Sequence, residues 1–225
     1  EKWEVSRKEQ DQFAAESYRR AVAAIASGTF KSQITPVTIA KKKGDVHFDT
    51  DECPVETTYE GLAAMRPAFC KEGFGTAGNA SIISDGAAAT LVMSREKAEE
   101  LGCTILAEIG AQASAGIALK HVLMAPILAI PKVLQKEGIT LADVELFEIN
   151  EAFSGTSVAI NKVLELDSSI INVNGGSVAI GHPIGASGAR VLTTLLHEMR
   201  NRDVKTGLAS LCLGGGEAVA LVLKR

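Results

Sequence analysis

From about residue 104 to the C-terminus, strand-like apolar segments alternate with helix-like segments, and this alternation restricts the possible folds more than any other feature. Strands are expected over 104–113, 144–149, 170–173, 207–213 and 218–224. Helices are expected over 126–136, 152–166 and 186–200. Alternation of this kind is typical of a layered α/β domain. The last two strands are joined by a three-glycine turn, so we predict a mixed five-stranded sheet with helices on both faces.

The first 83 residues alternate less regularly. Ser6 and Glu9 form a capping-box pattern that predicts a helix over 7–26, ended by Gly28. A second capping pattern, Thr57 with Glu60, precedes a short helix. Strands are expected over 34–40 and 46–48, and further on, a buried strand over 87–93 with a helix over 94–101.

Composition excludes several classes of partner and site. The net charge of −4 gives no electrostatic reason to expect nucleic acid or an acidic membrane. No apolar run reaches the roughly 20 residues that cross a bilayer. The cysteines form no CxxC pair, so neither a metal site nor a disulfide framework is expected, and the cytoplasm is the expected compartment.

Polar groups follow three of the expected strands. These are the pair Asn150-Glu151, the loop GHPIGASG over 181–188 and the segment CLGGGE over 212–217. Loops at strand ends are where α/β folds gather ligands and catalytic groups. The three segments therefore predict an active site with Asn150, His182 and Cys212 as its reactive groups.

Each of these residues also has an ordinary structural interpretation. Pro183 confines His182 to an extended backbone, which suits general acid–base work, but a hydrogen-bonded structural histidine fits equally well. A phosphate cradle is disfavoured, since the loop is neither GxGxxG nor GxxxxGK[ST]. Cys212 could be a buried apolar filler, although the adjacent glycines could present N–H groups as an oxyanion hole. Asn150 could simply cap a helix.

Taken together, the motifs resemble those of the thiolase family. NEAF over 150–153, NGGSVAIGHPIGASGAR over 174–190 and CLGGGEA over 212–218 are similar to its three C-terminal motifs in order and spacing. AGNAS over 77–81 with DGAA over 85–88 is similar to the motif before them. The resemblance covers the whole chain but only the later part of a thiolase. It implies a thiolase-like fold in which the N-terminal half, with the nucleophilic cysteine, is absent.

The resemblance also implies a role for each site residue. His182 would activate the missing cysteine and, with Asn150 and a water, hold the thioester oxygen. Cys212 would be the base at the acetyl carbon, and the N–H of Gly214 would complete an oxyanion hole. Ser81 would bind the pantetheine arm of coenzyme A, and Phe153 would line the acyl pocket. Coenzyme A thioesters would be substrates, with no further cofactor and no metal.

Three segments with different duties are implied. Residues 1–83 would be an α/β loop domain over the coenzyme A site, 84–103 a strand and helix completing the absent half, and 104–225 the C-terminal thiolase domain. The face made for the absent half would be uncovered, so we expect exposed apolar surface and self-association. The full-length form would be a homo-oligomer, and this chain alone should not turn over.

Two departures from the family pattern bear on the substrate. Leu123 and Ala125 replace glycines of a Met-Gly-x-Gly-Pro segment, and Val55 stands where relatives commonly have arginine. The favoured function is an acyltransferase acting on short-chain acetoacetyl-CoA, with longer 3-oxoacyl-CoA as the variant. A condensing enzyme that uses an acyl carrier protein, and a non-catalytic fragment or subunit that gives structure or coenzyme A contacts to a partner chain, are the alternatives.

Overall fold

The computed structural model describes residues 2–225, and a four-stranded mixed sheet lies at its centre. The strands are β3 (Glu108–Gly116), β4 (Leu146–Ile149), β5 (Thr206–Leu213) and β6 (Glu217–Lys224), in the order β3-β6-β5-β4. Only β4 and β5 run parallel. The α/β class and the mixed sheet are confirmed, and β3 begins four residues later than expected.

The expected fifth strand, over 170–173, is not formed. That stretch instead holds the 3₁₀ helix η4 (Ser168–Ile170) and one isolated parallel bridge between Phe147 and Ile171. Asn172 adopts a left-handed backbone with φ of 44°. Its side chain donates to the Ile149 carbonyl at 2.8 Å and accepts from the Ile149 N–H at 2.9 Å. A side-chain amide thus takes the hydrogen bonds of a neighbouring strand, and the prediction of five strands was wrong.

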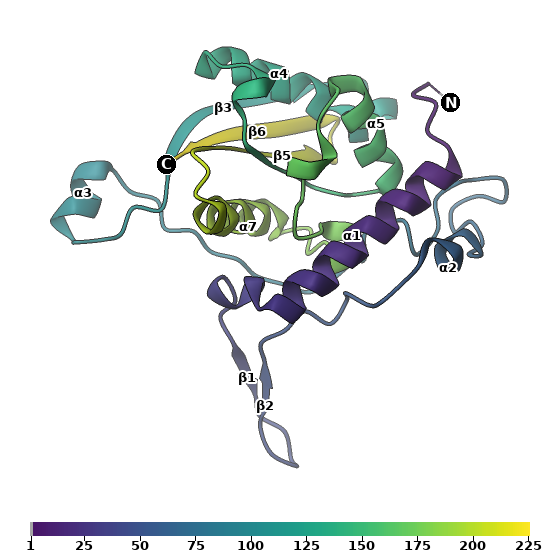
Figure 1. The fold of residues 1–225 in the computed structure, drawn as a ribbon, viewed down its shortest axis with the longest axis horizontal. Helices are drawn as coiled ribbons and strands as arrows, with labels where there is room; N and C mark the ends of the chain where they lie inside the picture. Colours follow the sequence, from purple (N-terminus) through teal and green to yellow (C-terminus); the bar gives the residue numbers. More distant parts are fainter. Residues whose placement is uncertain (1) are drawn as a thin grey trace.

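Helices cover both faces of the sheet, as predicted (Figure 1). On one face, α4 (Pro126–Glu137) and α5 (Ser154–Leu164) share a core with Phe147, Leu208 and Val222. On the other face, α7 (Ser187–Arg202) buries Val191, Leu195 and Met199 against the strands. The short helices η2 (Leu119–Met124) and η3 (Leu141–Asp143) lie in the connections on either side of α4.

The long N-terminal helix α1 (Arg7–Ser27) packs on the site end of the molecule. Both bonds of the Ser6–Glu9 capping box are present, and the helix ends at Gly28 with φ of 75°. Its buried face contacts α5, α2 (Tyr59–Ala63) and α6 (Ser177–Ile180). The cap of α2 is Thr58, one residue after the expected Thr57. Helix α1 therefore contributes directly to the surroundings of α6.

Two outlying parts make few contacts with the sheet. Strands β1 (Val37–Ile39) and β2 (Val46–Phe48) form an antiparallel ribbon that projects below α1 and the 3₁₀ helix η1 (Thr29–Ser32) (Figure 1). Helix α3 (Arg95–Glu100) forms as predicted, but the strand over 87–93 does not. A strand needs a neighbour for its backbone hydrogen bonds. No described segment pairs with 87–93, so Leu91, expected to be buried, is 82% exposed.

Within residues 2–225, no helix combines the length and the apolar character required of a membrane span.

Exposed apolar side chains in and near the segment 87–93 lead to a first prediction. Ile83, Leu91 and Val92 are all largely exposed. We expect the chain to self-associate at high concentration, because exposed apolar side chains are unfavourable in water. Light scattering over a concentration series measures this. Replacing Leu91→Ser together with Val92→Thr should lower the apparent mass, and a wild-type chain that stays monomeric throughout would contradict the expectation.

Candidate active site

Asn150 and Cys212 lie at the same edge of the sheet. Asn150 directly follows β4, is 5% exposed, and donates its N–H to the Ser210 carbonyl of β5 at 3.0 Å. Because β4 and β5 are parallel, Cys212 lies two residues further along the neighbouring strand in the same direction. Carboxyl edges of parallel strands are where sites form in α/β folds. The structure thus brings two of the predicted site residues to one edge.

The third predicted residue, His182, is fixed in the loop between α6 and α7. Its N–H donates to the Ile82 carbonyl at 2.7 Å, and Ile83 and His182 form an isolated parallel bridge. The preceding Gly181 has φ of 98°, and a Cβ there would lie 2.1 Å from Ser84 Oγ. Only glycine therefore fits. The loop holds His182 beside Asn150, with 3.4 Å between Nε2 and the Asn150 Nδ2.

Two neighbours of His182 bear on its tautomer. Ser187 Oγ lies 2.5 Å from Nδ1 and 3.0 Å from the Pro183 carbonyl, and Asn150 Nδ2 faces Nε2. The tautomer with the proton on Nδ1 fits all of these contacts, because Ser187 can then accept from the ring and donate to Pro183 while Nε2 keeps a lone pair for the Asn150 N–H. Burial, and then the charge of Arg190, lower the pKa of His182. His182 is therefore neutral at physiological pH, with its basic nitrogen facing Asn150.

The surroundings of Cys212 keep its thiol protonated and leave space beside it. Burial raises the pKa of Cys212. Gly214, two residues on, is exposed, and a side chain there would meet no atom within 4 Å. Gly216 closes the turn with φ of 91° and packs against the Ile117 carbonyl, a position that needs glycine. The turn after Cys212 is thus open at Gly214 and anchored at Gly216.

Ser81 and Phe153 also come together, although they are far apart in sequence. Ser81 N–H donates to the Ala152 carbonyl at 3.2 Å, and Ala80 pairs with Phe153 in an antiparallel bridge. Phe69 packs edge-on against Phe153 with 5.6 Å between ring centroids. Phe69 was missed by the sequence analysis, because a single aromatic residue in a loop carries no motif.

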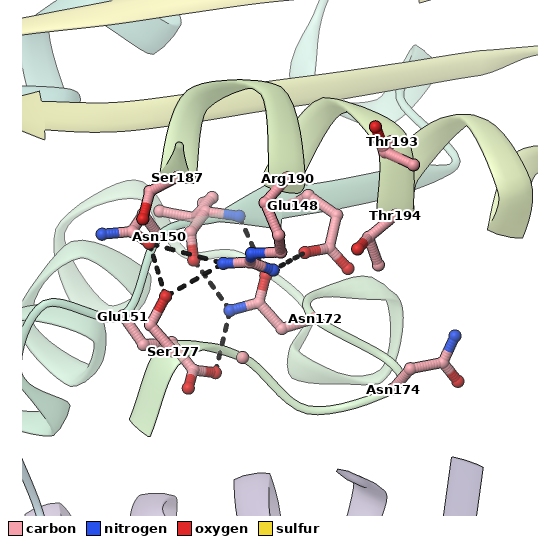
Figure 2. A network of polar contacts seen from close by, with 12 residues as sticks. Glu148, Asn150, Glu151, Asn172, Asn174, Ser177, Ser187, Arg190, Thr193 and Thr194 are labelled. Atoms are coloured by element: carbon pink, nitrogen blue, oxygen red, sulfur yellow. Dashed lines mark hydrogen bonds and ion pairs between the residues drawn. The ribbon is translucent and has the colours of Figure 1, made fainter. Parts of the chain in front are cut away.

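A buried carboxylate, Glu151, joins the site to helix α1. It accepts hydrogen bonds from Ser17 Oγ at 2.8 Å, Asn172 Nδ2 at 2.9 Å and the Val178 N–H at 3.2 Å. Figure 2 shows Glu151 beside Asn172 below Asn150. Burial raises the pKa of Glu151, while these three donors oppose the shift. With its oxygens occupied, Glu151 orders the backbone around the site rather than facing a substrate.

Glu148 is a second buried carboxyl group, and it is poorly paired. Its Oε2 lies 3.9 Å from Arg190 Nη1, and its Oε1 has no hydrogen-bond partner among the described residues. Burial raises the pKa of Glu148 to about 8, and the Arg190 charge only partly opposes this. Glu148 is therefore mostly protonated at neutral pH.

The arrangement combines a neutral imidazole, a side-chain amide and a thiol at one sheet edge. These groups can accept protons and donate hydrogen bonds to a carbonyl oxygen, which is the chemistry of reactions at an acyl group. Among residues 2–225, no three His, Cys, Asp or Glu side chains cluster as a metal site would require.

Two family models match the chain over separate ranges. The family model for the thiolase C-terminal domain matches residues 103–225, and the model for the thiolase N-terminal domain matches residues 1–96. The chain belongs to the thiolase family. The three strand-end motifs of this thiolase-family chain all lie within the C-terminal match.

Two curated relatives of this thiolase-family chain carry the same name. It is 52% identical to the acetyl-CoA acetyltransferase of Pseudomonas aeruginosa, over 100% of the chain and 58% of that relative. The acetyl-CoA acetyltransferase of Paracoccus denitrificans gives the same figures. The chain thus spans about 58% of the length of these curated relatives.

Solved structures agree in fold. The acetyl-CoA acetyltransferase of Bacillus anthracis superposes with a TM-score of 0.97 at 46% identity, covering 99% of this chain and 57% of that one. Human mitochondrial 3-ketoacyl-CoA thiolase gives a TM-score of 0.93 at 37% identity, with the same coverage. The thiolase-like fold predicted from the motifs is confirmed.

Close packing around Glu151 generates a second prediction. A Cβ at Gly176 would lie 2.3 Å from the Glu151 carboxyl carbon, whereas one at Gly185 would meet nothing within 4 Å. We expect Gly176→Ala to lower the free energy of unfolding by about 1–3 kcal/mol, as overpacking does. Gly185→Ala is the matched control and should change it by less than about 0.5 kcal/mol. Denaturant unfolding of both variants measures this, and equal values would contradict the packing described.

The raised pKa of Glu148 leads to a third prediction, on the pH dependence of stability. The folded state binds this proton more tightly than the unfolded chain, so the contribution of Glu148 is complete below about pH 4.5 and is lost as pH rises through about 8. The free energy of unfolding should therefore fall between these values, by at most about 1.4 kcal/mol per pH unit from this group. Glu148→Gln should reduce that fall.

Denaturant unfolding at about pH 5 and about pH 8 tests the expectation, with the exposed Glu72→Gln as a control for removing a carboxylate. A Glu148→Gln variant with the pH dependence of the wild type would show that Glu148 is ionised in the folded chain.

Proposed function

We propose that this chain supplies the proton-handling half of a thiolase active site, in a protein that makes or cleaves short-chain 3-oxoacyl-CoA, acetoacetyl-CoA above all. The observation that carries the proposal is the placement of His182, whose Nε2 lies 3.4 Å from Asn150 Nδ2, at the sheet edge where Cys212 also lies. Relatives about 50% identical are named acetyl-CoA acetyltransferase, which supports the short-chain substrate.

The first half-reaction needs a nucleophile and a base. A cysteine outside this chain would give its thiol proton to His182 Nε2 and attack the thioester carbonyl of an acyl-CoA. The carbon–sulfur bond to coenzyme A breaks as the acyl–cysteine bond forms. The departing thiolate of coenzyme A takes the proton back from His182. The N–H of Gly214, next to open space, would donate to the oxyanion of this step.

The second half-reaction needs a base for a weakly acidic C–H bond. In condensation, the Cys212 thiolate would take a proton from the methyl carbon of acetyl-CoA. Asn150 Nδ2, through a bound water, would donate a hydrogen bond to the resulting enolate oxygen, and the unprotonated Nε2 of His182 would help to hold that water. The carbanion then attacks the acyl–cysteine, a carbon–carbon bond forms, and the cysteine leaves as a thiolate. Cleavage runs through the same steps in reverse.

Burial of Cys212 suits both condensation and cleavage, for different reasons. A raised pKa makes the thiolate a stronger base once it has formed, which helps to remove a carbon-bound proton. It also keeps the thiol protonated at neutral pH, the form that returns a proton to the enolate in cleavage. The condensation rate should therefore depend on ionising Cys212.

The division into three segments follows from the same proposal. Residues 1–83 would form the loop domain over coenzyme A, with Ser81 at the pantetheine arm and Phe153 at the acyl pocket. Residues 84–103 would complete the N-terminal half, and 104–225 would be the C-terminal domain. The unpaired, exposed segment 87–93 and the coverage of about 58% of the relatives support this division. The chain by itself would be inactive, and the full-length form a homo-oligomer.

Two other functions remain as alternatives. In one, the chain is a non-catalytic subunit that contributes structure or coenzyme A contacts to a partner. In the other, it belongs to a condensing enzyme that uses an acyl carrier protein. The half-buried Cys212 at the sheet edge favours thiolase chemistry over a condensing enzyme that uses an acyl carrier protein.

A chimera tests the proposal. The part of the P. aeruginosa acetyl-CoA acetyltransferase that precedes the matched region is joined ahead of Glu1, and acetoacetyl-CoA cleavage by coenzyme A is measured. We expect no turnover from the chain alone and measurable turnover from the chimera. Cys212→Ser should lower the turnover of the chimera by about 10²–10⁴-fold, the usual loss for a general acid or base. The exposed Cys103→Ser is the matched control and should leave it unchanged.

An active chain without the added segment would show that the chain supplies its own nucleophile. A chimera that folds and binds coenzyme A but turns over neither acetoacetyl-CoA nor longer 3-oxoacyl-CoA would favour the non-catalytic alternative. Full condensation activity in Cys212→Ser, measured with an acyl carrier protein, would favour the condensing enzyme that uses that carrier.

A further inference from the structure

Arg190 is a mostly buried cation that donates hydrogen bonds toward the candidate site. It lies in the first turns of α7, and its side chain is 17% exposed. Its Nη2 donates to Ser177 Oγ at 2.9 Å and lies 3.5 Å from Asn150 Oδ1. Figure 2 shows the guanidinium between Glu148 and the pair formed by Ser177 and Asn150.

Pairing with Glu148 does not account for this cation. The two side chains are 3.9 Å apart, and the Nε and Nη1 atoms of Arg190 have no hydrogen-bond partner within the described part of the chain. Glu148 is also mostly protonated at neutral pH, since burial raises its pKa to about 8. The hydrogen bonds that Arg190 does make go to Ser177 and Asn150.

The direction of these hydrogen bonds follows from the chemistry of the groups. A guanidinium can only donate, so Ser177 Oγ must accept from Arg190. The one proton of the Ser177 hydroxyl is then free to be given elsewhere, and Asn150 Oδ1 lies 2.6 Å away. That contact requires Asn150 to present its oxygen to Ser177. Its Nδ2 therefore faces His182 Nε2 and the open side of the site.

We propose that Arg190 is a positioning residue that acts through Ser177 to fix which end of the Asn150 amide faces the substrate oxygen. This inference rests on the proposed function, in which Asn150 donates to an enolate oxygen through a water. A reversed amide would present an oxygen lone pair toward the developing negative charge. Asn150 alone cannot prevent the reversal, because its two ends are nearly the same size and shape.

The orientation of the Asn150 amide also affects the protonation of His182. In the observed orientation, Asn150 Nδ2 faces the free lone pair of His182 Nε2 and stabilises the neutral ring. A reversed amide would instead accept a hydrogen bond from a protonated Nε2 and stabilise the charged ring. The titratable groups that face Arg190 are Glu148, Glu151 and Asp51, and the charge that acts on His182 is that of Arg190 itself. The pKa of His182 therefore reports the orientation of Asn150.

The first arm of the test uses the chain as it is and needs no catalysis. The pKa of His182 is measured by NMR titration in wild type, Ser177→Ala, Arg190→Met and Thr193→Ala. We expect the pKa of His182 to rise in Ser177→Ala, where the Arg190 charge is retained, and to rise further in Arg190→Met. Thr193→Ala is the matched control on the same helix, because its hydroxyl donates to the Ala189 carbonyl, and it should cause no change.

A double-mutant comparison separates orientation from general disruption. In an Asn150→Ala background there is no amide to orient. Ser177→Ala should then leave the pKa of His182 unchanged, and Arg190→Met should retain only the effect of its lost charge. Arg190→Lys keeps a donor-only cation and should stay close to wild type. It also provides a folded variant should Arg190→Met prove unstable.

The second arm uses the chimera described above. Arg190→Met should lower kcat by about 10²-fold, near the loss of one oxyanion-hole donor, with little change in KM. Arg190→Lys should recover most of the activity. An unchanged His182 pKa in folded Ser177→Ala, or a Ser177→Ala effect that persists in the Asn150→Ala background, would overturn the inference. An inactive chimera would instead overturn the proposed function, and the titration would still decide the role of Arg190.

Discussion

The buried carboxylate of Glu151 is the interaction on which the geometry of the site end depends. Its three donors come from α1, from the segment after η4 and from the start of α6, three parts of the chain that share no sheet hydrogen bonds. The Gly176 N–H adds a fourth link by donating to Ser17 Oγ at 3.0 Å. A buried carboxyl group left without such partners is costly, so the three elements must pack together around it. Asn150 is adjacent in sequence, and its position follows from this convergence.

Much of the architecture could be predicted from local patterns. The capping box of α1, the core helices α4, α5 and α7, and strands β4, β5 and β6 all follow from periodicity and end signals. The errors have a common cause in tertiary context. The segment 170–173 is apolar enough for a strand, but the Asn172 side chain replaces the ladder. The segment 87–93 has a strand's composition but lacks a neighbouring strand among the described residues.

The sequence pointed to the residues proposed as reactive, and it did not point to the residues that support them. Asn150, His182 and Cys212 stand in recognisable motifs at strand ends, and the structure brings Asn150 beside His182. Ser177, Ser187 and Arg190 lie within one of those motifs, but no spacing rule distinguishes a serine that sets a tautomer from one that caps a helix. The role of each of these residues depends on which groups its side chain contacts as donor or acceptor, and only the structure shows those contacts. Phe69 has no sequence signal at all.

Ser187 and Arg190 are three residues apart and lie on neighbouring positions of a single helical turn. One contacts the imidazole directly, and the other reaches the amide through Ser177. Because a helical turn moves as a rigid body, a displacement of α7 carries both supports in the same direction, and the 3.4 Å spacing between His182 and Asn150 changes little. The short helix η2, which carries Leu123, is a different element. Substitutions in η2 can therefore accumulate while the geometry around His182 and Asn150 is kept.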